Sequence, residues 1–348
     1  MNMNISNNIT APCLLIAAMT ILILFQSVFF NYADVLFIGV EEIKNAGTDA
    51  ETETEIETGG ETGRDFIIYN NVKYKPDKFF ILTVISNICA FLLPAVFYVK
   101  FKGEGYLKNL KLGFPGRLRY VSLTIYMFFV LISGTVLINS LIFYSGGAGV
   151  NPESVLPFII DTGGNPVYDM GILVSFVVLP ALCEEFFFRS VLSAEYEKYG
   201  SFCALIITSA AFAMAHFSLK FFPSYFFAAV ILYILVRTTN SVLFAVMLHA
   251  GYNFFNIYLW DKLSGVLHFE QNRFIFIFIT AVIFIGFIYF VLNSLEVIYY
   301  KKAYGNEPSP VYSSGDKNMR AAAGRFLKSL FSPVFLAAAA VFFIYINL

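Results

Sequence analysis

Charged residues are scarce in this chain. Asp, Glu, Lys and Arg together make up 14% of its 348 residues, whereas soluble domains carry about 25%. Hydrophobic residues make up 58%, and apolar runs long enough to cross a bilayer recur from end to end. This composition excludes an ordinary soluble globular protein. It predicts an all-α, polytopic transmembrane helical bundle with about eight or nine spanning helices.

Cysteine, histidine and net charge are also low. The chain has four cysteines and three histidines, and its formal net charge is −1. The cysteines form no CxxC pair, which argues against a thiolate metal site or a disulfide framework. A basic stripe with interleaved aromatic residues is absent, so no nucleic-acid partner is expected. Neither HExxH nor GxSxG occurs, so two common signatures of hydrolases are missing.

Nine apolar runs are separated by polar loops. The helices are expected at residues 12–30, 78–99, 120–144, 171–192, 201–219, 223–236, 242–260, 274–292 and 333–346. At about 1.5 Å per residue, the last run barely matches a bilayer core of about 30 Å. The sequence therefore leaves open whether that last run spans the membrane.

Lysine and arginine are concentrated in two loops, at 100–119 and 301–328. Cytoplasmic loops carry an excess of these residues, so both loops are placed in the cytoplasm. Alternation then puts the loops at 41–77 and 145–169 outside and the N-terminus inside. The expected location is the cell membrane, with multiple passes. Because Thr alternates with acidic residues at 48–58, the loop at 41–77 is expected to be acidic and solvated.

Two adjacent glutamates and an arginine lie late in the fourth apolar run. Charges inside a bilayer are costly and mark functional positions. Adjacent helical residues point about 100° apart, so Glu184 and Glu185 cannot face one spot. Glu185 and Arg189 are spaced i,i+4 and can pair along one face, which leaves Glu184 facing the bundle interior. The structural alternative is an ion network between helices, with Arg189 snorkelling to the cytoplasmic interface.

Two histidines also fall in apolar runs. His216 follows Phe212 by one helical turn, and Asn253 follows His249 by one turn. The spacing lets His249 and Asn253 point at one locus, with Asn256 on nearly the same side. Each group alone could simply form hydrogen bonds between helices. Together with Glu184 they indicate one site, because buried polar groups need partners.

Such a site has two possible chemistries. Glu184 with His216 could bind and deprotonate a water, while His249 and Asn253 donate hydrogen bonds to an oxyanion. Alternatively, Glu184, His216 and His249 form the ligand set of a catalytic zinc with one open position. The residues by themselves do not separate the two.

The three motifs resemble those of a known family. Glu184-Glu185-x-x-x-Arg189, Phe212-x-x-x-His216 and His249-x-x-x-Asn253 follow one another in the order found in the CAAX-protease and bacteriocin-processing (CPBP or Abi) family, which includes the Ras-converting type of CAAX prenyl protease. The resemblance implies an intramembrane endopeptidase that opens to the cytoplasm. It implies that Glu184 and His216 activate water, that His249 and Asn253 stabilise the oxyanion, and that Glu185 and Arg189 support them.

A glutamate mechanism is favoured over a zinc one, because Asn253 is a poor zinc ligand but a good oxyanion donor. No cofactor is therefore favoured, with zinc as the alternative. The expected partners are a peptide or membrane-protein substrate and the lipid bilayer. The expected division is an N-terminal part (1–170), a catalytic core (171–260) and C-terminal helices (261–348).

Two functions of other classes stay open. A transporter would use the buried carboxylates as an ion or proton relay, although no matching pair of broken helices in two halves supports it. A non-catalytic membrane scaffold or bacteriocin-immunity protein would keep the fold without the chemistry, although all three motifs are intact.

Overall fold

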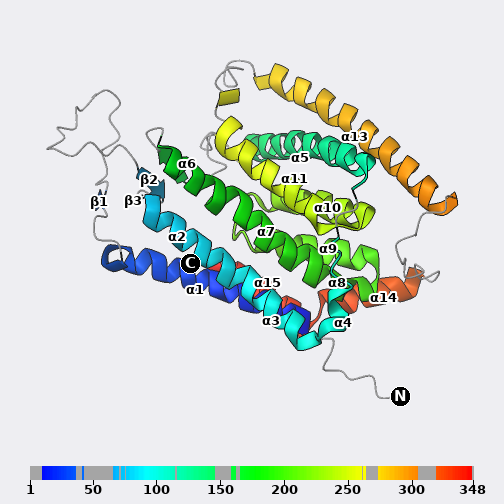
Figure 1. The fold of residues 1–348 in the computed structure, drawn as a ribbon, viewed down its shortest axis with the longest axis horizontal. Helices are drawn as coiled ribbons and strands as arrows, with labels where there is room; N and C mark the ends of the chain where they lie inside the picture. The colour runs from blue at the N-terminus through cyan, green and yellow to red at the C-terminus, as the bar shows by residue number, and fades with distance from the viewer. Residues whose placement is uncertain are drawn as a thin grey trace.

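A computed structural model describes residues 10–36, 41–42, 66–69, 72–74, 76–113, 116–145, 158–161, 165–260, 262–263, 273–304 and 319–346. In this part of the chain, long helices run side by side as a bundle (Figure 1). Six of them are long and apolar enough to cross a membrane: Phe79–Lys102, Leu118–Ile142, Pro166–Tyr199, Phe222–Thr239, Val242–Leu259 and Phe274–Lys301. Three shorter apolar helices accompany them, at Pro12–Gln26, Ser201–Met214 and Pro333–Tyr345. The predicted class, a polytopic helical membrane protein, is confirmed, and the predicted eight or nine spans are an approximate count.

The helical bounds follow the apolar runs. The α-helices are α1 (Thr10–Leu36), α2 (Pro76–Asn87), α3 (Leu93–Lys102), α4 (Glu104–Leu107), α5 (Leu118–Ser145), α6 (Pro166–Ile172), α7 (Leu179–Glu185), α8 (Ser193–Tyr196), α9 (Ser201–Met214), α10 (Phe222–Thr239), α11 (Val242–Phe254), α13 (Arg273–Tyr304), α14 (Met319–Leu330) and α15 (Pro333–Tyr345). Wider π-helical turns join several of them, at Ile88–Leu92, Leu173–Val178, Phe186–Leu192 and Phe255–Leu259, and a 3₁₀ turn at Glu197–Tyr199 follows α8. As a result, α6, α7 and α8 form one continuous span that carries the double glutamate.

The fifth helix was expected to reach residue 219 but ends at Met214. Phe217 has a positive φ of 47°, a conformation that breaks a right-handed helix. The next helix, α10, begins with Pro223 in its first turn, where proline fits because its missing N–H has no helical partner. The short segment between these helices takes His216 out of helical geometry.

A small antiparallel sheet was not expected. Its strands β1 (Glu41–Glu42), β2 (Phe66–Tyr69), β3 (Val72–Tyr74) and β4 (Phe158–Asp161) follow the order β1-β3-β2-β4. The loop at 41–77 is therefore not uniformly a solvated coil: the apolar run Phe66-Ile67-Ile68-Tyr69 pairs on both edges, whereas residues 48–58 lie outside the described residues. Because β2 pairs with β4, the two loops predicted to share one side of the membrane meet at the same end of the bundle.

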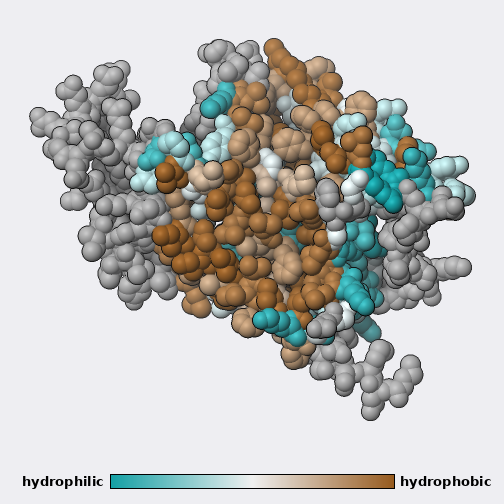
Figure 2. Space-filling view, viewed as in Figure 1, coloured by the Kyte–Doolittle hydropathy of each residue, from teal (hydrophilic) through white to brown (hydrophobic). Residues whose placement is uncertain are grey.

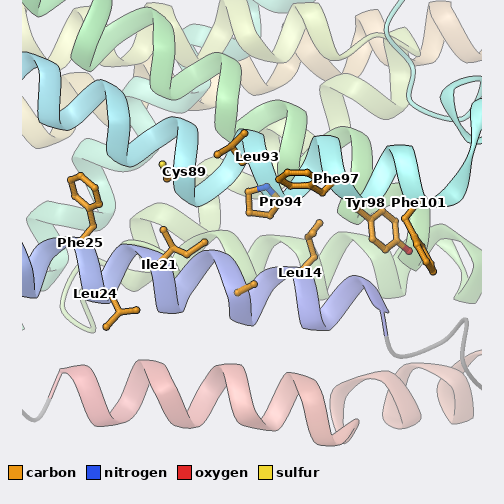
Figure 3. A pocket seen from close by; sticks show the side chains of 11 residues that line it. Leu14, Ile21, Leu24, Phe25, Cys89, Leu93, Pro94, Phe97, Tyr98 and Phe101 are labelled. Atoms are coloured by element: carbon orange, nitrogen blue, oxygen red, sulfur yellow. The ribbon is translucent and has the colours of Figure 1, made fainter.

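Two apolar clusters fill the bundle. One includes residues of α1, α3, α9 and α15, and the other residues of α5, α10, α11 and α13. Hydrophobic residues cover the middle of the face seen in Figure 2, and hydrophilic ones gather at its right end, near α4, α8 and α14. Between α1 and α3 lies an apolar groove of about 800 Å³, whose walls include Leu14, Ile21, Leu93 and Phe97 (Figure 3).

Ion pairs fasten the end of the bundle that carries α4 and α8. Lys111 Nζ lies 2.6 Å from Glu197 Oε1, and Arg237 Nη1 lies 3.5 Å from Glu197 Oε2. The carbonyl of Lys111 accepts from the N–H of Val242 at 2.9 Å. Burial lowers the pKa of Lys111, against the opposing attraction of the Glu197 carboxylate. These bonds of Lys111, called the clasp below, join the loop after α4 to the start of α11. They therefore help to fix the position of His249 along the bundle axis.

Candidate active site

Three helical elements bring the predicted site residues together. Glu184 and Glu185 end α7, which packs against α11, the helix of His249 and Asn253. His216 follows α9, which packs against α10. α7 begins directly after the π-helical stretch Leu173–Val178 and has Pro180 in its first turn. Such wide turns are typical of functional sites, because they re-aim the side chains that follow.

Glu185 is the centre of a buried ion network. Its Oε2 lies 3.1 Å from Arg189 Nε, and the two side chains are 0% and 1% exposed. The pairing predicted from the i,i+4 spacing is present. The snorkelling alternative for Arg189 is wrong: its Nη2 donates to the Ala229 carbonyl at 3.4 Å, and its guanidinium lies 4.3 Å from the centre of the Phe212 ring. Arg189 is held inside the bundle by these contacts.

His249 joins the same network from α11. Its Nδ1 lies 2.9 Å from Glu185 Oε1. Because a carboxylate beside an arginine only accepts, Nδ1 carries the hydrogen of this bond. The second ring nitrogen, Nε2, is then free for chemistry. A buried carboxylate that orients an imidazole through Nδ1 is also the arrangement of the serine-protease triad.

His216 is oriented in the same way by a different acceptor. Its Nδ1 lies 2.9 Å from the Phe212 carbonyl, which also only accepts, so Nε2 is again the free nitrogen. The ring is stacked on Tyr225, with centroids 4.0 Å apart and planes 23° apart. Both histidines therefore offer Nε2, and they interact electrostatically with each other.

Glu184 is buried without a partner for one of its oxygens. The residue is 8% exposed, and its Oε2 makes no hydrogen bond within the described part of the chain. It interacts electrostatically with His249, Glu185 and Arg189. Among the described residues, no hydrogen bond or ion pair joins Glu184 to His216. The structure thus brings Glu184, His249 and Glu185 together and sets His216 beside His249.

Asn253 lies one turn after His249 on the same helix and is half-buried. Its side chain makes no hydrogen bond to a residue that the structure describes. The amide is therefore available to a ligand on the face of α11 that carries His249.

Two tyrosines near the site were missed in the sequence analysis. Tyr225 on α10 stacks on His216 and interacts electrostatically with Glu184 and with Tyr252. Tyr252 on α11 lies beside Thr135 and Asn256. No spacing rule points to either one, since tyrosine is frequent in this chain, with 21 residues.

Glu184, His216 and His249, the alternative zinc set, remain the other candidate chemistry of these residues. Within the described ranges, no three His, Cys, Asp or Glu side chains are grouped as a metal site needs. The bond from His249 Nδ1 to Glu185 leaves Nε2 available, which suits an oxyanion donor and a metal ligand alike.

Neither a curated protein nor a solved structure matches the chain significantly. Residues 166–255 match the family model described as Type II CAAX prenyl endopeptidase Rce1-like. All three motifs lie within this segment. At the level of the family, the match supports a CAAX-type intramembrane protease. Residues 166–255 of this multi-pass membrane protein are therefore similar to the Rce1-like family, which agrees with the family that the three motifs predicted.

Proposed function

We propose that the protein is an intramembrane endopeptidase, in which water activated by Glu184 and His216 hydrolyses a peptide bond. One observation carries this proposal: the buried Oε2 of Glu184 has no partner in the described structure and lies in the electrostatic reach of His249. A buried, unsatisfied oxygen costs about 1–3 kcal/mol or more. A reacting water gives such an oxygen the partner it lacks.

The proposed reaction begins with that water. Glu184 accepts a proton from it while Nε2 of His216 orients it, and the resulting hydroxide attacks the carbonyl carbon of the peptide bond. The carbon becomes tetrahedral and its oxygen becomes an oxyanion. Glu184 then returns the proton to the amide nitrogen, the C–N bond breaks, and a carboxylate and an amine leave.

His249 and Asn253 stabilise the oxyanion in this proposal. Asn253 donates from its amide, one helical turn from His249. His249 donates from Nε2 in its doubly protonated form, and the Glu185 carboxylate at Nδ1 stabilises that cation. A preorganised donor of this kind contributes about 10²–10³ in rate. Glu185 and Arg189 are then positioning residues, because they act through His249.

The orientation and substrate class are part of the same proposal. The loops rich in lysine and arginine support a cytoplasmic N-terminus, because cytoplasmic loops carry an excess of these residues. The family description names CAAX prenyl endopeptidases, so a prenylated CAAX peptide is the first substrate to try, beside a peptide library without lipid.

The test is cleavage of quenched peptides by the purified, detergent-solubilised protein. Glu184→Gln is compared with Glu296→Gln, the same change at an exposed position of α13, and each sample is run with and without a zinc chelator. We expect Glu184→Gln to lose activity at least 100-fold, and we expect Glu296→Gln and the chelator to leave it unchanged. Full activity in Glu184→Gln refutes the proposal. Loss of activity with the chelator would instead indicate a metal enzyme.

The transporter alternative has its own readout. The parent and Glu184→Gln are reconstituted in liposomes, and proton and cation flux are followed. Flux that depends on Glu184, without peptide cleavage by the parent, would favour the transporter over the peptidase.

A further inference from the structure

Among the ring contacts of the described residues, Tyr225 is the one aromatic residue of α10 that stacks on a predicted site histidine. The two rings are 4.0 Å apart and nearly parallel. Phe212 borders the same imidazole at 4.8 Å with a 46° tilt. The ring of His216 is thus held between residues of two different helices.

His216 needs such support because it lies outside a helix. α9 ends two residues before it, and the next residue has a positive φ. The bond from Nδ1 to the Phe212 carbonyl fixes one atom of the ring. A single hydrogen bond leaves the ring free to swing about that atom, whereas a stacked face fixes the plane. The direction of the free Nε2 is set only when both contacts are present.

Tyr225 is itself firmly placed. The neighbouring Ser224 hydroxyl donates to Asn139 Oδ1 on α5, and the N–H of Tyr225 donates to the Phe221 carbonyl at 3.1 Å. The first bond joins the start of α10 to α5, and the second closes the first turn of α10 itself. Tyr225 also interacts electrostatically with Glu184. Tyr225 therefore lies against the His216 ring and also interacts with Glu184, the carboxylate that His216 is proposed to assist.

We propose that Tyr225 is a positioning residue of the site: its ring holds His216 so that Nε2 faces the water activated by Glu184. This inference rests on the proposed peptidase function. The role belongs to the ring face, so Tyr225→Phe should keep it and Tyr225→Leu should lose it. A misplacement of about 1 Å costs about 100-fold in rate.

The test uses two readouts. The matched control is Phe226→Leu, the same loss of an aromatic ring on the next residue of α10, where the ring stacks on Phe222 instead. In the cleavage assay, we expect kcat of Tyr225→Leu to fall about 10- to 100-fold with little change in KM. We expect Tyr225→Phe and Phe226→Leu to stay within about threefold of the parent, because neither removes the stack on His216. A Tyr225→Phe variant as impaired as Tyr225→Leu would overturn the role of the ring.

The second readout needs no substrate. NMR relaxation of isotope-labelled histidine reports how far each imidazole ring moves, and comparison with His216→Gln assigns the His216 signals. We expect the His216 ring to be rigid in the parent, Tyr225→Phe and Phe226→Leu, and mobile in Tyr225→Leu, while thermal unfolding checks that every variant is folded. A His216 ring that stays equally rigid in folded Tyr225→Leu overturns the inference. A parent without peptidase activity refutes the proposed function instead, and the ring relaxation still decides whether Tyr225 positions His216.

Discussion

The buried pair between Arg189 and Glu185 gives a quantitative test of the network. At 3.1 Å and an effective dielectric constant of about 20, its attraction is about 5 kcal/mol. Arg189→Met keeps the bulk of the side chain but removes the charge. Among the described residues, Glu185 then keeps His249 as its one ion-pair partner, at 2.9 Å. Breaking a buried pair from one side costs about 3–5 kcal/mol, and we expect Arg189→Met to lose that much stability.

The control is an ion pair on the same helical span in which the lysine reaches solvent, while the Glu195 side chain is 6% exposed and also lies 3.9 Å from Lys102. Lys198 Nζ lies 2.6 Å from Glu195 Oε2, but the lysine side chain is 51% exposed. Exposed pairs contribute about 0–1 kcal/mol, so Lys198→Met should cost less than about 1 kcal/mol although its ion pair is shorter. Burial, and not distance, decides the difference. Stability is measured by thermal unfolding in detergent and by unfolding in lipid bicelles.

A double variant separates stability from chemistry. Arg189→Met with Glu185→Leu removes both charges, and an apolar replacement of a buried pair is close to neutral. We expect the double variant to regain most of the stability that Arg189→Met loses. It should stay inactive, because His249 then lacks the acceptor that orients Nδ1. The reasoning is refuted if Arg189→Met costs no more than Lys198→Met, or if the double variant is as unstable as the single one.

Three further predictions concern packing, the clasp and the oxyanion site. A Cβ on Gly134 would clash with the Phe227 ring, whereas a Cβ on Gly286 would meet nothing within 4 Å. Gly134→Ala should therefore lower the free energy of unfolding by about 1–3 kcal/mol and Gly286→Ala should not lower it, as measured by thermal unfolding. Lys111→Met removes one of the two cations beside Glu197 and leaves Arg237 as the other. We expect a loss of about 1–2 kcal/mol in the free energy of unfolding. An equal loss in Glu197→Gln would show that the loss comes from the ion pair. Asn253→Ala should lower kcat about 10²–10³-fold with KM nearly unchanged, and a change confined to KM would contradict an oxyanion role.

Hydropathy predicted the class of fold because a bilayer leaves few alternatives. Every backbone group in lipid must be bonded within its own segment, so long apolar runs become helices. The runs at 78–99, 120–144 and 242–260 accordingly match described helices within a few residues. Where the environment is not lipid, the same reasoning failed. The strand Phe66–Tyr69 lies in a segment that was expected to be a solvated loop because of its acidic composition. The helix α14 was not expected, because its overall composition is too polar for an apolar run.

Contacts within one helix were predictable, and contacts between helices were not. The Glu185–Arg189 pair follows from the i,i+4 spacing alone. The Glu185–His249 bond joins residues 64 positions apart, and it depends on how α7 and α11 are rotated and tilted against each other. The stack of Tyr225 on His216 depends in addition on the early end of α9. The sequence therefore predicted which residues gather, but not the partner that fixes each histidine.

The two adjacent glutamates acquire different environments because one helical step turns the second side chain by about 100°. Glu185 faces Arg189 and His249, and each of its oxygens has a charged or polar neighbour. Glu184 points about 100° away from Glu185 and keeps Oε2 without a hydrogen-bond partner in the described structure. One carboxylate is thus fully engaged in orienting a histidine, and only its neighbour is free to take a proton. A single glutamate could not serve both purposes, since the bonds that hold His249 occupy the oxygens that a general base needs free.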